Sequence, residues 1–394
     1  MAAYRLHRAL SRAGAESRLY VREKLSSDDD VIQLPPRVAS PWPDRFKRLL
    51  GPKPIKTTYT FNLDEPPRVE LKSLPDTRAV TVLHWMSKFL DVRSIKILAD
   101  RFAGPLLWVI HDLDPVTGGC HYNFGCEGYR HECGKCPQLE SSDPNDLSHR
   151  TWLRKKQLLA GLPICFVAPT RWGETRVRES SLFKDHRVAR IPLSLDTAIF
   201  RPYAKRTARE VLHLPPEKTI LLFGASYLED RRKGVPELIE ALHKLQGTDI
   251  LLLIVGLNGH EIVKNLPFES RYLGQVHDQL MMALVYQAAD IFICPSLADS
   301  GPMMIPEAML CGTPVVAFDT GGAPDWIETG KTGYLARLGD TGDLAHGIDF
   351  LLASDRDPMG AAARERAEML HAPDRVAREH LLLYEELNAK GRQD

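Results

Sequence analysis

The chain has 394 residues, enough for two domains, and it carries 51 basic and 51 acidic side chains. Its composition is that of a globular protein, and no apolar run approaches the length of a membrane span. The charge is unevenly divided, since residues 1–205 hold 33 Lys and Arg against 23 Asp and Glu, and the remainder holds 18 against 28. A basic first half favours an anionic partner such as a lipid pyrophosphate or a membrane surface, although an ordinary Arg-rich surface explains it equally well.

The first helix is predicted over residues 2–13, where apolar residues form a stripe, and the strand SRLYV follows it. A Rossmann-like domain opens with a strand and a glycine turn before its first helix, so we expect that the sequence begins one element late. A start assigned downstream of the real one is our preferred explanation, because a missing inner strand would expose its neighbours. The N-terminus does not resemble a signal peptide, which predicts a cytoplasmic protein.

Residues 26–78 are rich in Pro and charge and are expected to be irregular. Their basic segment 45–56 is typical of a solvated helix end, with peripheral contact to the inner face of a membrane as the alternative.

Two histidines are predicted to stand at the carboxyl ends of neighbouring strands. The strands AVTVLHW and PLLWVIHDL follow and carry His84 and His111. Parallel strands end at one edge of a sheet, where ligands bind, so both histidines are predicted to belong to a functional site.

Four cysteines follow at the spacing C-x5-C-x6-C-x2-C, namely Cys120, Cys126, Cys133 and Cys136. Four thiols within a short stretch that ends in a C-x2-C pair favour a structural Zn²⁺ site, with His121 and His131 as substitute ligands. Disulfides and four free thiols remain alternatives, and a reducing compartment argues against disulfides. Gly118 and Gly119, just before the first cysteine, would let the backbone approach a ligand closely.

A second domain is predicted to begin after residue 205, where Pro and charge replace the apolar runs. Its first strand, TILLFGAS, leads through the loop YLEDRRKG into the helix VPELIEALHKL. Arg231, Arg232 and Lys233 stand at the end of this loop, directly before the helix start. Cations and helix-start amides together favour the binding of a diphosphate, and a solvated charge run is the plainer alternative.

The stretch from Pro295 to Phe318 is predicted to complete half of a doubly wound parallel sheet. The strand DIFIC precedes it, a loop with Asp299 and Gly301 follows, a helix begins near Met304 and carries Glu307, and the strand PVVAF ends it. Ligands of such sheets sit beyond the carboxyl ends of the strands, where free amides suit phosphate. Glu307 lies in the first turn of the helix, where a carboxylate can accept a hydrogen bond from a sugar hydroxyl.

The spacing of Asp299 and Glu307 resembles the E-x7-E motif of glycosyltransferase family 4, with Asp in place of the first Glu, and the run GPMMIPEAMLCGTPVVAFDTGGAPDWI is similar to the same enzymes. The resemblance implies the α/β GT-B fold, with two Rossmann-like doubly wound domains facing a cleft. It implies transfer of a sugar from a UDP- or GDP-sugar with retention of configuration and no obligatory catalytic metal. It also implies that the C-terminal helix, within residues 373–394, packs back on the N-terminal acceptor-side domain, leaving 206–372 as the donor domain.

The resemblance further implies roles for individual residues. Asp299 would contact the donor sugar, Glu307 the ribose, and Lys233 the diphosphate; Ala225 stands where the family has Arg, so Arg231 or Arg232 must replace it. His111 would stabilise the reacting centre or shuttle a proton. The predicted donor-binding residues are Arg231, Arg232, Tyr272, Gly274, Ser296, Ser300, Gly301, Pro302, Met303 and Met304. The predicted acceptor-side residues are His84, Gly118 and Gly119.

The strings TGGCHY and CPQL resemble a subgroup of family 4 from bacterial exopolysaccharide assembly of the colanic-acid type. The acceptor implied is a glycan or a lipid-pyrophosphate-linked sugar, and no nucleic acid is expected as a partner. Two other readings remain: a truncated, non-catalytic homologue that binds a nucleotide or a partner, and another GT-B enzyme such as a nucleotide-sugar epimerase.

Overall fold

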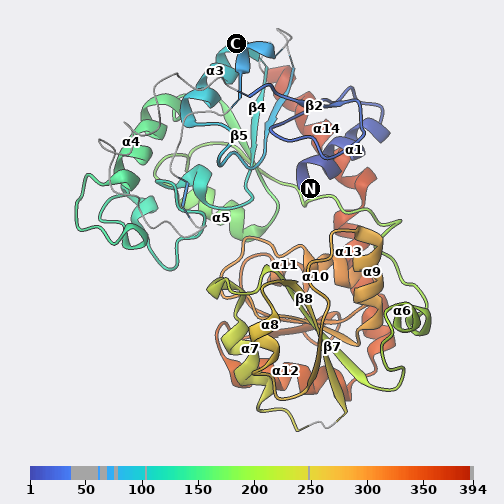
Figure 1. Ribbon diagram of the computed structural model, residues 1–394. Coiled ribbons are helices and arrows are strands. Elements are labelled where there is room, and N and C mark those ends of the chain that lie inside the picture. Colours follow the sequence, from blue (N-terminus) through green and yellow to red (C-terminus); the bar gives the residue numbers. More distant parts are fainter. Residues whose placement is uncertain (37–60, 63–68, 75–78, 103, 247–248, 391–394) are drawn as a thin grey trace. The chain divides into compact units, whose positions relative to one another are not determined.

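The computed structural model describes residues 1–36, 61–62, 69–74, 79–102, 104–246 and 249–390, and it divides into two compact units (Figure 1). The first unit holds residues 3–191 and the chain from 377 on, and the second holds residues 192–376. The basic segment 45–56 singled out in the sequence lies outside the described residues. No helix of the described part of the chain is long and apolar enough to cross a bilayer.

A four-stranded parallel sheet in the order β3-β4-β5-β6 forms the centre of the first unit, and a separate parallel pair, β1 and β2, precedes it. The strands are β1 (Leu19–Val21), β2 (Val31–Gln33), β3 (Thr81–Leu83), β4 (Leu106–Val109), β5 (Ile164–Ala168) and β6 (Val188–Arg190). The expectation that residues 26–78 are irregular is wrong at β2, because Val31 is buried and its strand pairs with β1. The missing first strand stays a prediction.

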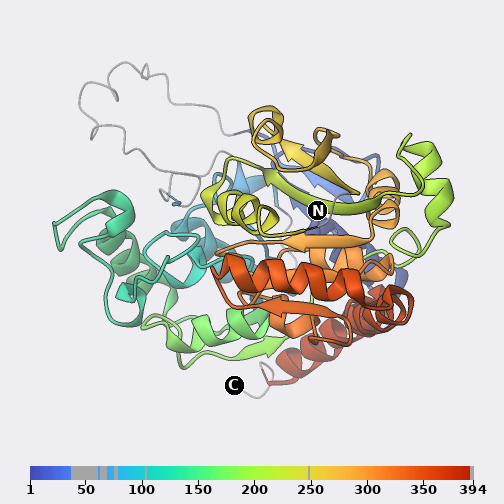
Figure 2. The same ribbon diagram turned by 90° about the horizontal axis from the view of Figure 1, so that it is seen from below.

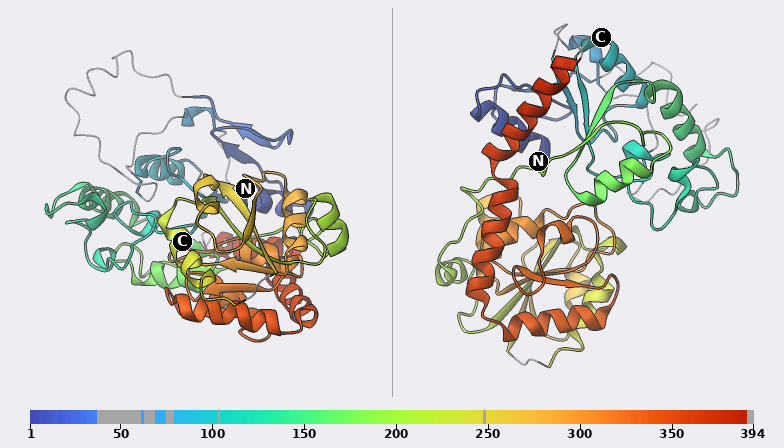
Figure 3. Two further views of the ribbon diagram at one scale, coloured as in Figure 1. Left: turned by 60° about the horizontal axis from the view of Figure 1, so that its bottom comes forward. Right: turned by 180° about the vertical axis from the view of Figure 1, so that it is seen from behind.

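Helices cover this sheet through apolar faces of the predicted period. They are α1 (Ala2–Arg12), α3 (Val92–Phe102), α4 (Leu147–Leu159) and α5 (Arg171–Glu179), and the long α14 (Pro373–Lys390) is best seen from behind (Figure 3). In α3 the buried Val92, Ile95 and Leu98 recur every three residues and enter one core with Trp108 and Phe166 of the sheet. From residue 377 on, α14 belongs to this unit, and Glu386 forms an ion pair with Arg187.

The second unit is a six-stranded parallel sheet in the order β12-β11-β10-β7-β8-β9. Its strands are β7 (Thr219–Tyr227), β8 (Ile250–Leu257), β9 (Glu269–Tyr272), β10 (Ile291–Cys294), β11 (Val315–Phe318) and β12 (Gly333–Ala336). Its helices are α6 (Lys205–Val211), α7 (Val235–Leu242), α8 (His260–Val263), α9 (Gln279–Ala288), α10 (Met304–Leu310), α11 (Ala323–Trp326), α12 (Thr341–Ala353) and α13 (Arg356–His371). The predicted strand, loop, helix and strand around residues 291–318 are therefore confirmed.

Both faces of this sheet are buried, each in a core of its own. Alternate residues of β7 divide between them, so that Ile220 and Leu222 face α9, α10 and α13, whereas Leu221 and Phe223 face α7 and α12 (Figures 1 and 2). A strand buried on both faces reads as a continuous apolar run, which is how TILLF and ILLLIV appear in the sequence.

The division between the units falls at Ile191 and Pro192, earlier than the predicted boundary after residue 205. The reason is that Leu195 and Phe200 are fully buried in the core of the second unit. The Leu195 N–H also donates to the carbonyl of His371 at the end of α13. The second unit correspondingly ends at Val376, four residues beyond the predicted end at 372.

Candidate functional site

The candidate site lies in the second unit, where the winding of the sheet reverses. From β7 the chain proceeds to β8 and β9 on one side, and from β10 it proceeds to β11 and β12 on the other. The point between β7 and β10 is thus the topological switch point, where open parallel sheets bind their ligands beyond the carboxyl ends of the strands. The loops after these two strands carry the predicted cations and the predicted acid.

The loop after β7 is held directly against the loop after β10. Asp230 caps a single 3-10 turn by accepting the Arg232 N–H at 3.0 Å, and the turn ends at Gly234 with φ of 69°. A Cβ at Gly234 would lie 1.8 Å from the carbonyl oxygen of Pro295, so only glycine fits there. The Leu297 N–H donates to the Arg232 carbonyl at 2.7 Å, and the two loops together place Lys233 beside Asp299.

Lys233 and Asp299 form a short, largely buried ion pair. The Lys233 Nζ lies 2.6 Å from Asp299 Oδ2, the Gly301 N–H donates to Oδ1 at 3.2 Å, and Asp299 is only 7% exposed. Burial raises the pKa of the Asp299 carboxyl, but the charge and hydrogen bond of Lys233, with Arg232 and the Gly301 N–H, outweigh it and leave the pKa below its usual value. Asp299 is therefore an anion that fixes a cation at the switch point.

Glu307 stands in the first turn of α10, as predicted, and a tyrosine from another helix orients it. The Tyr286 hydroxyl of α9 donates to Glu307 Oε2 at 3.0 Å, and the Tyr286 carbonyl accepts the Thr313 hydroxyl at 2.8 Å. The Tyr286 ring is fully buried, so its hydroxyl position is fixed by packing. The local sequence gave no signal for Tyr286, which lies 21 positions before Glu307.

The two candidate arginines are in different surroundings. Arg231 is exposed and binds both carboxylate oxygens of Glu237 on α7, at 2.5 and 2.6 Å. Arg232 is largely buried, donates to Asp230 at 2.6 Å and donates to the carbonyl of Ala298 at 3.0 Å, next to Asp299. Arg232 is thus the arginine that the fold brings to the Lys233–Asp299 pair.

The other predicted donor-binding residues of this region pack around the two loops or form part of the loop after β10. Met303 and Met304 pack on the core, and a Cβ at Gly224 of β7 would lie 2.4 Å from the Met304 methyl group. Ser296 is buried, and its hydroxyl accepts a hydrogen bond from the Cys294 thiol at 3.7 Å. Ser300, Gly301 and Pro302 form the partly exposed loop that leads into α10.

Tyr272 and Gly274 belong to a separate cluster at the ends of β8 and β9. The Tyr272 hydroxyl donates to the Gly256 carbonyl at 2.6 Å, and the Gly256 N–H donates to the Gly274 carbonyl at 2.9 Å.

A further glycine, to which the sequence assigned no role, lies against the loop of Asp299. A Cβ at Gly321, whose φ is 57°, would lie 1.8 Å from the Asp299 carbonyl oxygen. The Gly321–Gly322 pair in the sequence was the signal for this approach.

In the first unit, the two predicted histidines do meet. His84 Nδ1 lies 2.9 Å from His111 Nε2, so one of the two rings donates to the other. Burial lowers the pKa of His111 to about 4, although the charge of Asp112 acts in the opposite direction. Burial and the charge of His111 hold the pKa of His84 well below its usual value. Both rings are therefore neutral at neutral pH, which suits them to donate and accept hydrogen bonds rather than to bind an anion by charge.

A second polar cluster lies beside these histidines. His121 Nδ1 is 2.8 Å from Asp112 Oδ2, and its Nε2 is 3.3 Å from the Ser87 hydroxyl. Burial lowers the pKa of His121, but the hydrogen bond and charge of Asp112 outweigh it and raise the pKa above its usual value. Trp85, which is 62% exposed, lies edge-on to the His121 ring.

At Gly118 and Gly119 the close approach that requires glycine is made by backbone of the protein itself. A Cβ at Gly118 would lie 2.2 Å from the Ser148 carbonyl oxygen, and one at Gly119 would lie 2.6 Å from that of Asn62.

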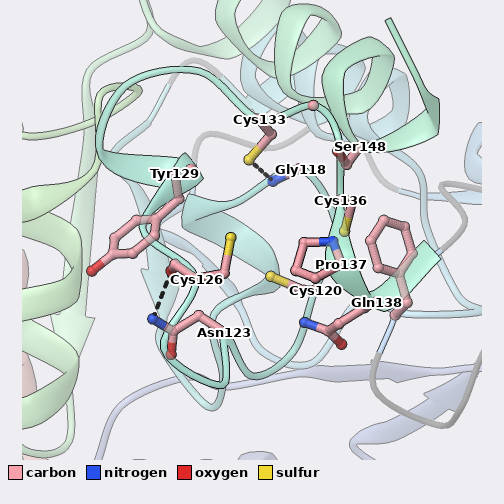
Figure 4. A pocket seen from close by; sticks show the side chains of 13 residues that line it. Gly118, Cys120, Asn123, Cys126, Tyr129, Cys133, Cys136, Pro137, Gln138 and Ser148 are labelled. Atoms are coloured by element: carbon pink, nitrogen blue, oxygen red, sulfur yellow. Dashed lines mark hydrogen bonds between the residues drawn. The ribbon is translucent and has the colours of Figure 1, made fainter. Parts of the chain in front are cut away.

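The four predicted metal-binding cysteines are all free thiols that line one pocket (Figure 4). In their present positions, no three His, Cys, Asp or Glu side chains of the described residues could hold a metal ion.

Sequence comparison connects the second unit to known enzymes. Residues 217–354 match the sequence model of the family described as glycosyl transferases group 1. The second unit is similar to this family. A D-inositol 3-phosphate glycosyltransferase 2 from Catenulispora acidiphila is 32% identical over 182 residues, and a D-inositol 3-phosphate glycosyltransferase from Mycobacterium sp. (strain KMS) is 34% identical over 193. These matches cover 42% and 46% of the chain and 42% and 41% of the relatives, so the chain spans less than half the length of the curated relatives it matches.

Structural comparison extends over both units. The sucrose-phosphate synthase from Thermosynechococcus elongatus gives a TM-score of 0.62 at 24% identity, over 79% of this chain and 74% of that one. HepE of Anabaena, solved in complex with UDP, gives 0.58 at 18% identity, over 78% and 79%. These likenesses show the fold, and the predicted α/β fold class with Rossmann-like units of the GT-B type is confirmed.

Proposed function

We propose that the protein is a glycosyltransferase that takes a sugar from a nucleotide-sugar donor. The observation that carries the proposal is the Lys233–Asp299 pair at the switch point, within the residues that match the group 1 glycosyltransferases. Lys233 and Arg232 supply cations for a diphosphate, and Glu307, oriented by Tyr286, supplies an acceptor for a ribose hydroxyl. Stabilising the charge of the departing nucleotide is the main contribution these residues make to the reaction.

The pairing suggests how the donor is taken up. A diphosphate near Lys233 competes with Asp299 for the ammonium group, because both are anions that need the same hydrogen-bond donors. The exchange frees one Asp299 oxygen, which then accepts a hydrogen bond from a hydroxyl of the donor sugar. Asp299 thus holds Lys233 in place before the donor binds and contacts the sugar afterwards.

The finer features of the reaction follow the resemblance seen in the sequence. We propose transfer of a hexose with retention of configuration to a glycan or lipid-pyrophosphate-linked acceptor, in the synthesis of a bacterial surface polysaccharide. His111, whose ring is hydrogen-bonded to that of the neutral His84, would contact the acceptor or the donor sugar by hydrogen bonding. We propose that the protein acts in the cytoplasm and that its basic first half makes peripheral contact with anionic lipid.

A thermal-shift screen against UDP, GDP, ADP, dTDP and their sugars tests the donor assignment, since a ligand of the native state raises the melting temperature. We expect a shift with one nucleotide, and UDP is the first candidate because HepE was solved with UDP and with UDP-glucose. Absence of a shift with every nucleotide would favour a non-catalytic homologue. Release of an epimer without an acceptor would favour an epimerase.

The role of Glu307 has an isosteric test. Glu307→Gln keeps the hydrogen bond from Tyr286 but removes the charge, so we expect loss of sugar transfer with an unchanged melting temperature of the free protein. Glu237→Gln, at the carboxylate that pairs with the exposed Arg231, is the matched control and should keep its transfer activity. Full transfer activity in Glu307→Gln would remove Glu307 from the donor site.

A further inference from the structure

Four thiols outside the proposed donor site line a single pocket of the first unit. Cys120, Cys126, Cys133 and Cys136 lie on the segment between β4 and α4, and the pocket also includes Phe61. In the close-up the four sulfur atoms approach the same space from different sides (Figure 4). The fold therefore brings the four cysteines to one pocket.

This segment, residues 110–146, is long and has little regular secondary structure. Its regular structure consists of three single 3-10 turns, at Asp114–Val116, Gly128–Arg130 and Pro137–Leu139. A buried ion pair of Lys155 with Asp114, at 3.0 Å, anchors its first part. Long connections without secondary structure are uncommon in compact domains, and they gain most from a cross-link such as a metal ion.

One of the four sulfurs already accepts a hydrogen bond from the backbone. The Gly118 N–H donates to Cys133 Sγ at 3.2 Å, and hydrogen bonds of this kind stabilise a sulfur anion that binds a metal. The turn between Cys133 and Cys136 requires left-handed backbone, with φ of 150° at Gly134 and 47° at Lys135. Both thiols of this C-x2-C pair line the pocket, and such pairs are common ligands of structural zinc.

The neighbouring histidine is not available as a ligand. Both ring nitrogens of His121 already face partners, Asp112 at 2.8 Å and Ser87 at 3.3 Å. No His, Asp or Glu is among the described residues that line the pocket, so its metal-ligating groups are the four thiols, which suit Zn²⁺ among the common divalent ions.

We propose that Cys120, Cys126, Cys133 and Cys136 bind one Zn²⁺ in a structural site that fixes the segment between β4 and α4. Each thiol gives up its proton to solvent as it binds, so the ion is held by four thiolates at about 2.3 Å. The sulfurs must move inward to reach this geometry, since as they stand the described side chains do not yet form a metal site. A Cβ added at Gly125 would meet no atom within 4 Å, so there is open space beside the backbone next to Cys126.

Metal analysis of the intact chain, purified under reducing and chelator-free conditions, tests the proposal. We expect one equivalent of zinc, loss of it in Cys133→Ser, and retention in Cys165→Ser, whose thiol is buried in β5 away from the pocket. Reconstitution with Co²⁺ should give the thiolate charge-transfer bands and the strong visible absorption of a tetrahedral all-sulfur site. A zinc-free protein, or Cys133→Ser with a full equivalent of zinc, would overturn the proposal.

A measurement on the unmodified chain covers the case in which Cys133→Ser fails to fold. A zinc chelator should lower the melting temperature of the protein and release four thiols that then react with a thiol reagent. Mass spectrometry that finds a disulfide among the four cysteines in freshly purified, alkylated protein contradicts the proposal. Neither result depends on nucleotide binding, so the zinc site and the donor site succeed or fail separately.

Discussion

Lys233 joins stability and ligand binding in one side chain. It neutralises a carboxylate that is otherwise buried, and it is the group that we expect to meet the donor diphosphate. A carboxyl whose folded pKa is lowered stabilises the native state above the usual carboxyl range, and this contribution is lost as the pH falls through the folded pKa. At neutral pH the pair is therefore fully formed, and removing one partner leaves a buried charge.

Lys233→Met is expected to lower the free energy of unfolding by roughly 3–5 kcal/mol, because Asp299 would stay buried and unpaired. Arg231→Met is the matched control: it removes an exposed cation from the same turn and should cost less than about 1 kcal/mol. Urea unfolding of both variants measures the difference. Equal stabilities would mean that the Lys233–Asp299 pair contributes nothing to the native state.

The histidine pair of the first unit predicts a pH dependence. The folded pKa of His111 is about 4, and that of His84 is also lowered. Below pH 6.5 the unfolded chain therefore binds protons at these histidines that the folded chain does not bind. Stability should fall as the pH drops from 6.5 to 4, by at most about 1.4 kcal/mol per pH unit for each ring.

Urea titrations at pH 7 and pH 5 check this dependence. The double variant His84→Gln with His111→Gln should lose much of the slope, whereas His277→Gln, at an exposed histidine of the second unit, should keep it. A slope that is unchanged in the double variant would assign the acid sensitivity to other groups.

At this scale the sequence identified residue types better than it identified contacts. Asp299, Glu307 and Lys233 were proposed from motifs that resemble those of a glycosyltransferase family, and their ligand contacts stay predictions. That Lys233 binds Asp299 could not be read, because 66 positions separate them and only the folded sheet brings their loops together. Nor could the sequence distinguish Arg231 from Arg232, since their different partners depend on which way a single 3-10 turn faces.

Among the elements, the loop that carries Lys233 depends on one glycine. Gly234→Ala would add a Cβ 1.8 Å from the Pro295 carbonyl oxygen, so the two loops would have to separate. Gly330→Ala is the matched control, because Gly330 also has a positive φ, 81°, but has nothing within 4 Å. Both variants bear the strain of a left-handed alanine, about 1 kcal/mol, and only Gly234→Ala bears the clash.

We therefore expect Gly234→Ala to melt well below Gly330→Ala and to lose the thermal shift with the donor nucleotide. Thermal unfolding with and without that nucleotide, run on both variants side by side, measures the two effects. If the variants behave alike, the approach of the two loops does not position Lys233.

Apolar runs and glycines were sufficient to predict most elements of the second unit, because strands buried on both faces have no other reading. They failed where packing between distant segments decides the outcome. Leu195 and Phe200 look like part of a linker, but they enter the core of the second unit and shift its beginning to Pro192. Gly118 and Gly119 suggested a close approach by a ligand. In the structure the atoms that approach them closely are the carbonyl oxygens of Ser148 and Asn62.

At the scale of the whole molecule, the two units have separate cores, and each holds one of the proposed sites. The core of the first unit, with Trp108 and Phe166, supports the segment that carries the four cysteines. The two cores of the second unit support the loops after β7 and β10. A ligand of one site should therefore stabilise its own unit first.

Hydrogen exchange on the intact chain can read both sites in one experiment. The donor nucleotide should slow exchange in residues 228–234 and 295–307, because it binds the loops that hold Lys233 and Asp299. A zinc chelator should instead speed exchange in residues 110–146 and leave the second unit unchanged. Protection by the nucleotide confined to the first unit would contradict the donor site, and a chelator effect confined to the second would contradict the zinc site. Since the two perturbations act on different segments of the same chain, each serves as the control for the other.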